Sequence, residues 1–239
     1  MQIKTKAIVI STLKYGEADV IAKCFTQEKG LVSYMLKGIR KSKRAKLRMS
    51  MFQQLSLIEI EAFHKENKNL QYLREVKLYN PYQNLQSNVY KSSMVMFISE
   101  VIKNCIQEEE KNEALFQFLN DSCIYLDKAE HFKNFHLHFI VKLTKYLGFY
   151  PDNQSKDFPY FDMQNGVFQL KEYSSYSFND SNSALLKLLM SSEYYDDSQD
   201  ISLNQDRRKH FLDFMMLYFE MQLQGFKKPK SLEVLQQIF

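Results

Sequence analysis

The hydrophobic pattern of the chain changes its period once, at Asn80-Pro81, and this change limits the folds open to it. Before that point apolar and polar residues alternate, as in SLIEIEAF (56–63), where the isoleucines share one face and the glutamates the other. Beyond it apolar residues recur every three or four positions, which is the period of a helix. The sequence therefore predicts an α+β chain in which a β module precedes an all-α helical module.

Short apolar runs separated by turns define the first module. Strands are predicted at AIVI (7–10), LVSYML (31–36), SLIEIEAF (56–63) and LQYLREVKLY (70–79), with turns at KYGEAD (14–19) and EKG (28–30). Several short strands within 80 residues are typical of a small β-barrel or sandwich. We expect one β domain over residues 1–80.

The second module, residues 81–239, has the spacing of amphipathic helices. Apolar residues predict helices near 94–106, 113–126, 132–147, 183–190 and 207–223, and another after Pro229. The polar stretch from about 150 to 182 is predicted to be a loop-rich insertion with a short hairpin around Gly166.

Composition excludes several classes of protein. Apolar residues make up 45% of the 239, enough for a packed core, and no window of about 18 is apolar throughout. The opening MQIKTKAIVIST lacks the features of a signal peptide, and Cys24, Cys105 and Cys123 form neither a CxxC pair nor an even set. We therefore expect a cytoplasmic protein that is not inserted in a membrane.

Charge divides the chain into two unlike parts. Residues 1–80 contain 16 Lys and Arg against 7 Asp and Glu, a net +9, whereas the remaining 159 contain 16 against 21, a net −5. Such asymmetry predicts a polyanionic partner for the first part.

The positive charge is concentrated in KGIRKSKRAKLR, residues 37–48, which we call the basic run; it holds seven cations and no carboxylate. Its candidate DNA-binding residues are Lys37, Arg40, Lys41, Lys43, Arg44, Lys46 and Arg48. Without local carboxylates their field is not cancelled, which favours contact with a phosphate backbone, general in sequence and sensitive to salt. A solubilising loop is the simpler alternative. Docking on an anionic membrane is a further one, although only Ile39, Ala45 and Leu47 are apolar.

Aromatic residues near the predicted strands offer a platform on which bases can stack. These are Tyr15, Phe25, Tyr34 and Phe52, of which at least half are expected in the core of the barrel.

Motifs for catalysis are absent from the sequence. It has only 6 Gly, no glycine-rich phosphate loop and no GxSxG or HExxH. On a helix, His131 and His138 would lie near one face with His136 turned away, so they are interpreted as surface or edge-of-core histidines. Glu108–Glu110 is interpreted as a solvated helix end, with a nuclease-type cation site as the alternative, and the cysteines as core residues. We predict a protein that is not an enzyme.

The opening AIVISTLKYGEADVIAKCFTQEKGLVSYMLKGIRKSK resembles the start of the bacterial RecO family of recombination mediators. The shared elements are the YGEAD turn (15–19), the FTQEKG segment (25–30) and a basic loop after KG (37 onward), in that order. KYLGFYPD (145–152) is similar to the family's junction before a metal-binding insertion. The resemblance runs the length of the chain.

The resemblance implies an N-terminal OB-fold that binds DNA, followed by a helical domain. It implies binding of single- and double-stranded DNA, annealing of complementary strands, and partnership with RecR and with the acidic C-terminal tail of single-stranded-DNA-binding protein. With RecR, such a protein helps to load RecA onto coated strands, without breaking bonds. The basic run matches the place where the family presents positive charge.

One departure concerns metal. Many relatives carry two CxxC pairs after the LGF element, whereas residues 149–182 contain no cysteine, so we predict no zinc and no other cofactor. That segment would fold on its aromatics, namely Phe158, Tyr160, Phe161 and Phe168, or stay mobile. For the acidic tail, cations beside apolar helix faces are available at Lys142, Lys145, Arg207, Arg208 and Lys209, but no spacing distinguishes them from an ordinary charged surface.

An alternative of another class remains open at this point. A basic loop beside aromatic residues does not distinguish deoxyribose from ribose, so an RNA- or ribosome-associated OB-fold protein has the same features.

Overall fold

The computed structural model describes residues 1–41, 47–65, 68–106 and 110–239. Its contacts divide the chain into two compact units, Met1–Lys128 and Ala129–Phe239, and each is described by itself. None of the helices in these described stretches is both long and apolar enough to cross a membrane.

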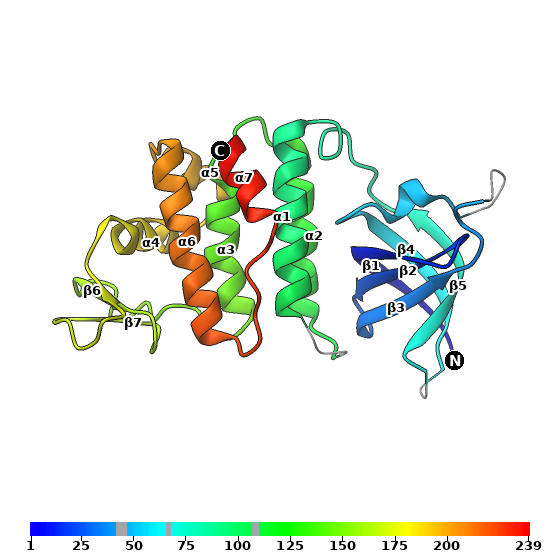
Figure 1. Ribbon diagram of the computed structural model, residues 1–239, viewed down its shortest axis with the longest axis horizontal. Helices are drawn as coiled ribbons and strands as arrows, with labels where there is room; N and C mark the ends of the chain where they lie inside the picture. Colours follow the sequence, from blue (N-terminus) through cyan, green and yellow to red (C-terminus); the bar gives the residue numbers. More distant parts are fainter. Residues whose placement is uncertain (42–46, 66–67, 107–109) are drawn as a thin grey trace. The chain divides into compact units, whose positions relative to one another are not determined.

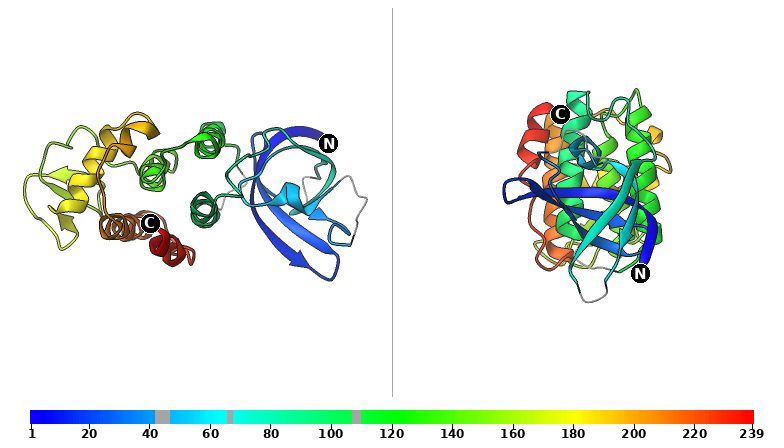
Figure 2. Two further views of the ribbon diagram at one scale, coloured as in Figure 1. Left: turned by 90° about the horizontal axis from the view of Figure 1, so that it is seen from above. Right: turned by 90° about the vertical axis from the view of Figure 1, so that its right-hand side faces the viewer.

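The first unit begins with a closed barrel of five strands. They are β1 (Gln2–Tyr15), β2 (Asp19–Thr26), β3 (Gly30–Leu36), β4 (Leu57–Phe63) and β5 (Leu70–Leu78). Around the barrel the order is β1-β2-β3-β5-β4, and β4 pairs with β1 to close it. All pairs are antiparallel except β3 with β5. Figure 1 and the left panel of Figure 2 show these strands, blue to cyan, wrapped around one axis.

The predicted small β-barrel is therefore confirmed, and its core explains why these segments form strands. Residues at alternate positions point inward and are buried, and Phe52 of the short 3-10 helix η1 (Met49–Phe52) joins them. Buried in this core are Ile3, Ala7, Val9, Val20, Ala22, Cys24, Val32, Tyr34, Leu36, Ile39, Phe52, Ile58, Ile60 and Ala62. Removing such side chains from water is the main force that closes the barrel.

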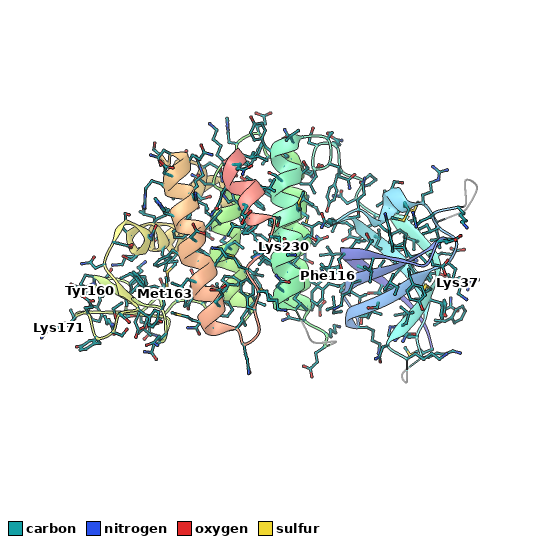
Figure 3. All side chains as sticks on the ribbon, viewed as in Figure 1. Lys37, Phe116, Tyr160, Met163, Lys171 and Lys230 are labelled. Atoms are coloured by element: carbon teal, nitrogen blue, oxygen red, sulfur yellow. The ribbon has the colours of Figure 1, made fainter. Side chains whose placement is uncertain are left out.

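Two helices, α1 (Val89–Cys105) and α2 (Glu113–Lys128), complete the first unit. They cover apolar residues on the outer surface of the barrel: the rings of Phe116 in α2 and Phe25 in β2 lie 6.3 Å apart. The Ser99 hydroxyl of α1 donates to the Ile10 carbonyl at 2.5 Å. Figure 3 shows Phe116 on the side of α2 that faces the strands.

The second unit is helical apart from one small sheet. Its helices are α3 (Phe135–Tyr146), α4 (Ser181–Ser191), α5 (Tyr195–Gln199), α6 (Gln205–Gln222) and α7 (Leu232–Ile238). Contacts join α3 to α4, α5 and α6, and Figure 1 shows α3 and α6 side by side. The sheet has the order β7-β6-β8, built from β6 (Tyr160–Asp162), β7 (Val167–Gln169) and β8 (Ser177–Phe178).

The insertion folds on its aromatic residues, and the expected hairpin around Gly166 is present. The rings of Phe161 and Phe168 lie 4.9 Å apart, and the ring of Phe161 lies 5.4 Å from that of Tyr218 in α6. Gly166 has a φ of +67°, and a Cβ there would come within 2.7 Å of the Tyr218 hydroxyl oxygen. Only glycine fits this turn.

Sequence and structure differ in some details. β1 extends well beyond the apolar run at 7–10, and β2 was not singled out by the pattern. α3 begins at Phe135, so His131 precedes it and the predicted arrangement of the three histidines on one helix is wrong. The contacts place α1 and α2 with the barrel, and a folding boundary near residue 80 stays a prediction.

Candidate nucleic-acid interface

The basic run leaves the end of β3 in a fixed conformation. The N–H of Gly38 donates to the Asp19 carboxylate at 2.7 Å, and the Arg40 guanidinium donates to the Glu17 carbonyl at 3.0 Å. Gly38 has a φ of +66°, a backbone conformation that glycine adopts without strain. The turn between β1 and β2 thus sets the direction in which the basic run departs.

The predicted site residues that the structure describes all lie at the surface: Lys37, Arg40, Lys41 and Arg48 are exposed. Lys43, Arg44 and Lys46 lie outside the described residues. Of the exposed four, Lys41 pairs with Glu17 at 2.9 Å; because both groups are well exposed, the pair is weak and does not cancel the charge of the run.

The apolar residues of the basic run pack against the barrel. Ile39 is a buried member of its core, and Leu47 packs against it, half-buried. These two contacts anchor the run near both ends. Because Ile39 and Leu47 pack against the barrel, two of the three apolar residues of the run are not available for insertion into a membrane.

An exposed aromatic pair lies beside the start of the run. Phe63 in β4 and Tyr72 in β5 are direct cross-strand partners, 50% and 44% exposed, and we call them the outer aromatic pair. The Lys37 ammonium lies 5.2 Å from the centre of the Tyr72 ring. Figure 3 shows Lys37 at the surface of the barrel. A flat apolar surface next to a cation is the arrangement that single-strand binders use to stack bases.

A β-bulge in β5 turns Tyr72 outward. Glu61 pairs with Glu75 and Ala62 with Leu73, so Arg74 is the extra residue. One extra residue reverses the alternation of a strand. Leu73 therefore packs against the core, and Tyr72 points to the outer surface.

The aromatic residues that the sequence offered for base stacking differ in their exposure. Phe25, Tyr34 and Phe52 are fully buried and cannot meet a base, whereas Tyr15, 55% exposed, ends β1. The expectation that at least half would be core is confirmed.

Sequence reasoning missed the outer aromatic pair. Phe63 shares its alternation with the outward-facing Glu59 and Glu61, a signal that could have found it. Plain alternation from the inward-facing Val76 would point Tyr72 inward as well. The bulge reverses this direction, so no simple pattern in the sequence reveals that Tyr72 faces outward.

On the neighbouring surface of β1, β4 and β5, a glutamate lies between two lysines. Glu59 lies 3.3 Å from the Lys4 ammonium and 2.9 Å from that of Lys77. The hydrogen bond from Lys77 lowers the pKa of Glu59 below its usual value. The basic run, by contrast, has no carboxylate among its own residues.

Among the described residues, the groups considered as metal ligands form no metal site. His136 and His138 are buried in the second unit, whereas His131 is exposed. Among the residues that the structure describes, no three His, Cys, Asp or Glu side chains come together as metal ligands. Glu108 and Glu109 lie outside those residues.

The thiols lie in apolar surroundings, as the sequence predicted. Cys24 and Cys123 are buried, and Cys105 is half-buried. Burial raises the pKa of the Cys24 and Cys123 thiols to about 12, so they are not thiolates at neutral pH.

Several cations considered for the acidic tail bond to their own unit. Arg207 donates to the Ser181 carbonyl at 2.7 Å, and Arg208 donates to the Asn134 side chain at 3.0 Å. Lys142 donates to the Glu193 carbonyl. These bonds join helices of the second unit.

Comparison with known proteins covers the whole chain. The family model described as Recombination protein O N terminal matches residues 1–82, and the one described as Recombination protein O C terminal matches residues 86–233. The DNA repair protein RecO of Christiangramia forsetii is 46% identical over 239 residues, all of both chains. Those of Flavobacterium johnsoniae and Bacteroides fragilis are 44% and 33% identical over at least 98% of each chain.

Proposed function

This chain belongs to the Recombination protein O family, and from that membership we propose that it is a DNA repair protein whose barrel binds DNA through the basic run. The observation that carries the proposal is the run itself, seven cations without a carboxylate on a closed β-barrel. Counterion release from the phosphates would supply most of the affinity.

The family assignment also bears on catalysis. The family consists of recombination mediators without enzymatic activity, so the prediction of a non-enzyme is confirmed. The role proposed for the chain is therefore to bring nucleic acids and proteins together.

We further propose the finer activities that the sequence resemblance implies. The protein binds single- and double-stranded DNA, anneals complementary strands, and, with RecR, helps to load RecA onto strands coated with single-stranded-DNA-binding protein, whose acidic tail it contacts. It works in the cytoplasm at the nucleoid. Supporting this are the exposed cations, the outer aromatic pair beside Lys37, and the full-length similarity to proteins named DNA repair protein RecO.

Strand annealing tests the proposal directly. Two complementary oligonucleotides coated with single-stranded-DNA-binding protein are mixed with wild type or with a variant carrying Lys43→Gln, Arg44→Gln, Lys46→Gln and Arg48→Gln. Arg40 and Lys41 are left in place because they contact the β1–β2 turn. Wild type should anneal the strands fast, and the variant slowly. In binding measurements across a salt series, the log–log slope of affinity against salt should be shallower in the variant by about 0.7 for each phosphate that is no longer neutralised.

A matched variant removes four cations elsewhere, through Lys103→Gln, Lys128→Gln, Lys171→Gln and Lys230→Gln, all exposed in the helical part of the chain. It should behave as wild type. Equal annealing by both variants would place the DNA site outside the basic run. No annealing by wild type, with stronger binding of a matched RNA strand, would overturn the proposal in favour of an RNA-binding protein.

A further inference from the structure

A small pocket opens at one end of the barrel, next to the outer aromatic pair. It has a volume of about 130 Å³ and lies between the start of β3 and the residues on either side of the β4–β5 connection. Its lining includes the apolar Leu31 and Val32 and three lysines, Lys29, Lys65 and Lys68. This volume is the space open to the centres of water-sized spheres, of which one water needs about 10–15 Å³. The pocket therefore has room for a phosphate-sized anion.

A buried amide shapes this pocket. Gln71, only 3% exposed, accepts the Lys65 N–H at 2.9 Å and donates to the Lys65 and Lys68 carbonyls at 2.9 and 2.5 Å. The Lys68 N–H also donates to the Lys65 carbonyl at 3.1 Å. The amide of Gln71 thus brings both lysines to the same pocket.

The described lining contains no carboxylate that would neutralise these lysines. Glu28, adjacent to Lys29 in the chain, lies 3.5 Å from the Lys111 ammonium instead. Glu66 lies outside the described residues. Three lysines in the lining of a small pocket favour a compact, hard anion over an extended peptide.

The pocket is continuous with the aromatic pair along the chain. Phe63 immediately precedes His64 of the pocket, and Tyr72 immediately follows Gln71. The parallel pairing sets Met35 beside Tyr72. β3 leads away from the pocket at Leu31, and Lys37, which follows its last residue, lies next to the Tyr72 ring. Six residues of strand cover roughly 20 Å, a span over which one strand of nucleic acid passes several phosphates.

We propose that this seam between β3 and β5 is a track for a single nucleic-acid strand. Bases stack on Phe63 and Tyr72, one phosphate enters the pocket of Lys29, Lys65 and Lys68, and the strand continues past Lys37. The inference rests on the proposed function and adds to it a preference for single strands, since a base within a duplex does not present its face to a side chain. In this proposal the rings hold bases and the lysines hold a phosphate. Each contact can therefore be removed and measured without the other.

The stacking step is tested with a tryptophan reporter, because the natural chain has none. In full-length Phe63→Trp, emission should be quenched by a short oligothymidylate and not by an abasic strand with the same number of phosphates. Tyr72→Leu should weaken oligothymidylate binding roughly tenfold, the size expected when one base no longer stacks, and leave abasic binding unchanged. Tyr72→Phe, which keeps the ring, should bind as wild type.

The phosphate step has a different signature. Lys65→Gln with Lys68→Gln should weaken the binding of both strands alike and make the log–log slope of affinity against salt shallower by up to about 0.7, which corresponds to the one phosphate of a single strand held in the pocket. The matched pair Lys103→Gln with Lys128→Gln, exposed lysines on α1 and α2, should leave the slope unchanged. Tyr173→Trp, 72% exposed in the second unit, serves as the unquenched reporter.

The outcomes separate this inference from the proposed function. If wild type binds neither strand, the proposed function itself fails. If wild type binds DNA and the basic-run variant does not, the proposed function stands. The track is nevertheless overturned if Phe63→Trp emission is not quenched, or if the Lys65→Gln, Lys68→Gln variant binds like its matched control.

Discussion

The buried carboxylate of Asp127, on α2, fixes the connection between the barrel and α1. Its oxygens accept the backbone N–H groups of Gln83, Asn84 and Leu85 at 2.8 to 3.1 Å. The buried Lys91 ammonium donates to the Asp127 carbonyl at 2.9 Å. The N–H groups would otherwise be desolvated without partners, a costly state.

Asp127→Ala should therefore lower the free energy of unfolding by about 3 kcal/mol, since the variant cannot form these hydrogen bonds to a charged group and the freed donors stay desolvated. Urea unfolding measures this change. Asp121→Ala, which removes an exposed carboxylate from the same helix, should cost less than about 0.5 kcal/mol. Equal costs would show that the residues after the barrel do not depend on Asp127.

His136 is a buried residue whose charge the fold does not accommodate. It is fully buried in α3, 5.2 Å from the Phe239 ring, and its ring nitrogens have no hydrogen-bond partner among the residues that the structure describes. Burial, and then the nearby Arg208, lower the pKa of His136 to about 3. Because the unfolded pKa is near 6.5, protonation below that pH favours the unfolded chain.

The stability contributed by neutral His136 is complete above pH 6.5 and should fall by about 1.4 kcal/mol per pH unit below it, down to the folded pKa. Between pH 7 and 5, wild type should lose about 2 kcal/mol more than His136→Phe, measured by urea unfolding at each pH. His131→Phe, at an exposed site, should follow wild type. Parallel curves for wild type and His136→Phe would contradict the assignment.

At the scale of elements, the bulge in β5 shows where sequence reasoning succeeds and where it stops. Strict alternation in β4 correctly predicted which face of Ile58, Ile60 and Ala62 is buried. In β5, plain alternation in the sequence would place Tyr72 on the same inward face as Val76, but the extra residue Arg74 interrupts the alternation. A bulge depends on pairing with the partner strand, which a single strand's pattern does not contain.

Deleting Arg74 should leave the barrel folded with Tyr72 still outward. Without the extra residue, Leu73 takes the next inward position after Val76, and plain alternation then gives the faces that the bulge now gives. Circular dichroism and quenching of a Tyr72→Trp reporter by oligothymidylate would check this. A folded deletion variant that is no longer quenched would mean that the twist of the bulge, and not only its register, positions the ring.

The candidate site was predictable in its charges and not in its aromatic rings. Uncompensated lysines and arginines are visible in a sequence because nothing nearby neutralises them, whereas Phe25, Tyr34 and Phe52 look like stacking candidates until burial shows them to be core. The turn that directs the basic run depends on Asp19 and Gly38, which are 19 positions apart and joined by the hairpin. Contacts of this kind follow from topology.

At the scale of the whole molecule, the barrel and the first two helices share a core. Ile8, Ile10 and Phe25 are almost completely buried, yet they lie outside the inner core of the barrel. The contacts of Phe25 with Phe116 and of Ile10 with Ser99 identify α2 and α1 as their cover. The family models meet between residues 82 and 86, whereas the contacts divide the chain after Lys128.

These two boundaries predict different behaviour for truncated chains. A fragment of residues 1–128 keeps the cover of Ile8, Ile10 and Phe25, so it should fold alone, stay monomeric and bind oligothymidylate with the salt dependence of the full chain. A fragment of residues 1–82 exposes that apolar surface and should aggregate. Thermal unfolding and size-exclusion chromatography of both fragments decide the matter. A stable, monomeric 1–82 barrel would show that the matched N-terminal domain is also the folding unit, with α1 and α2 docked on it as an addition.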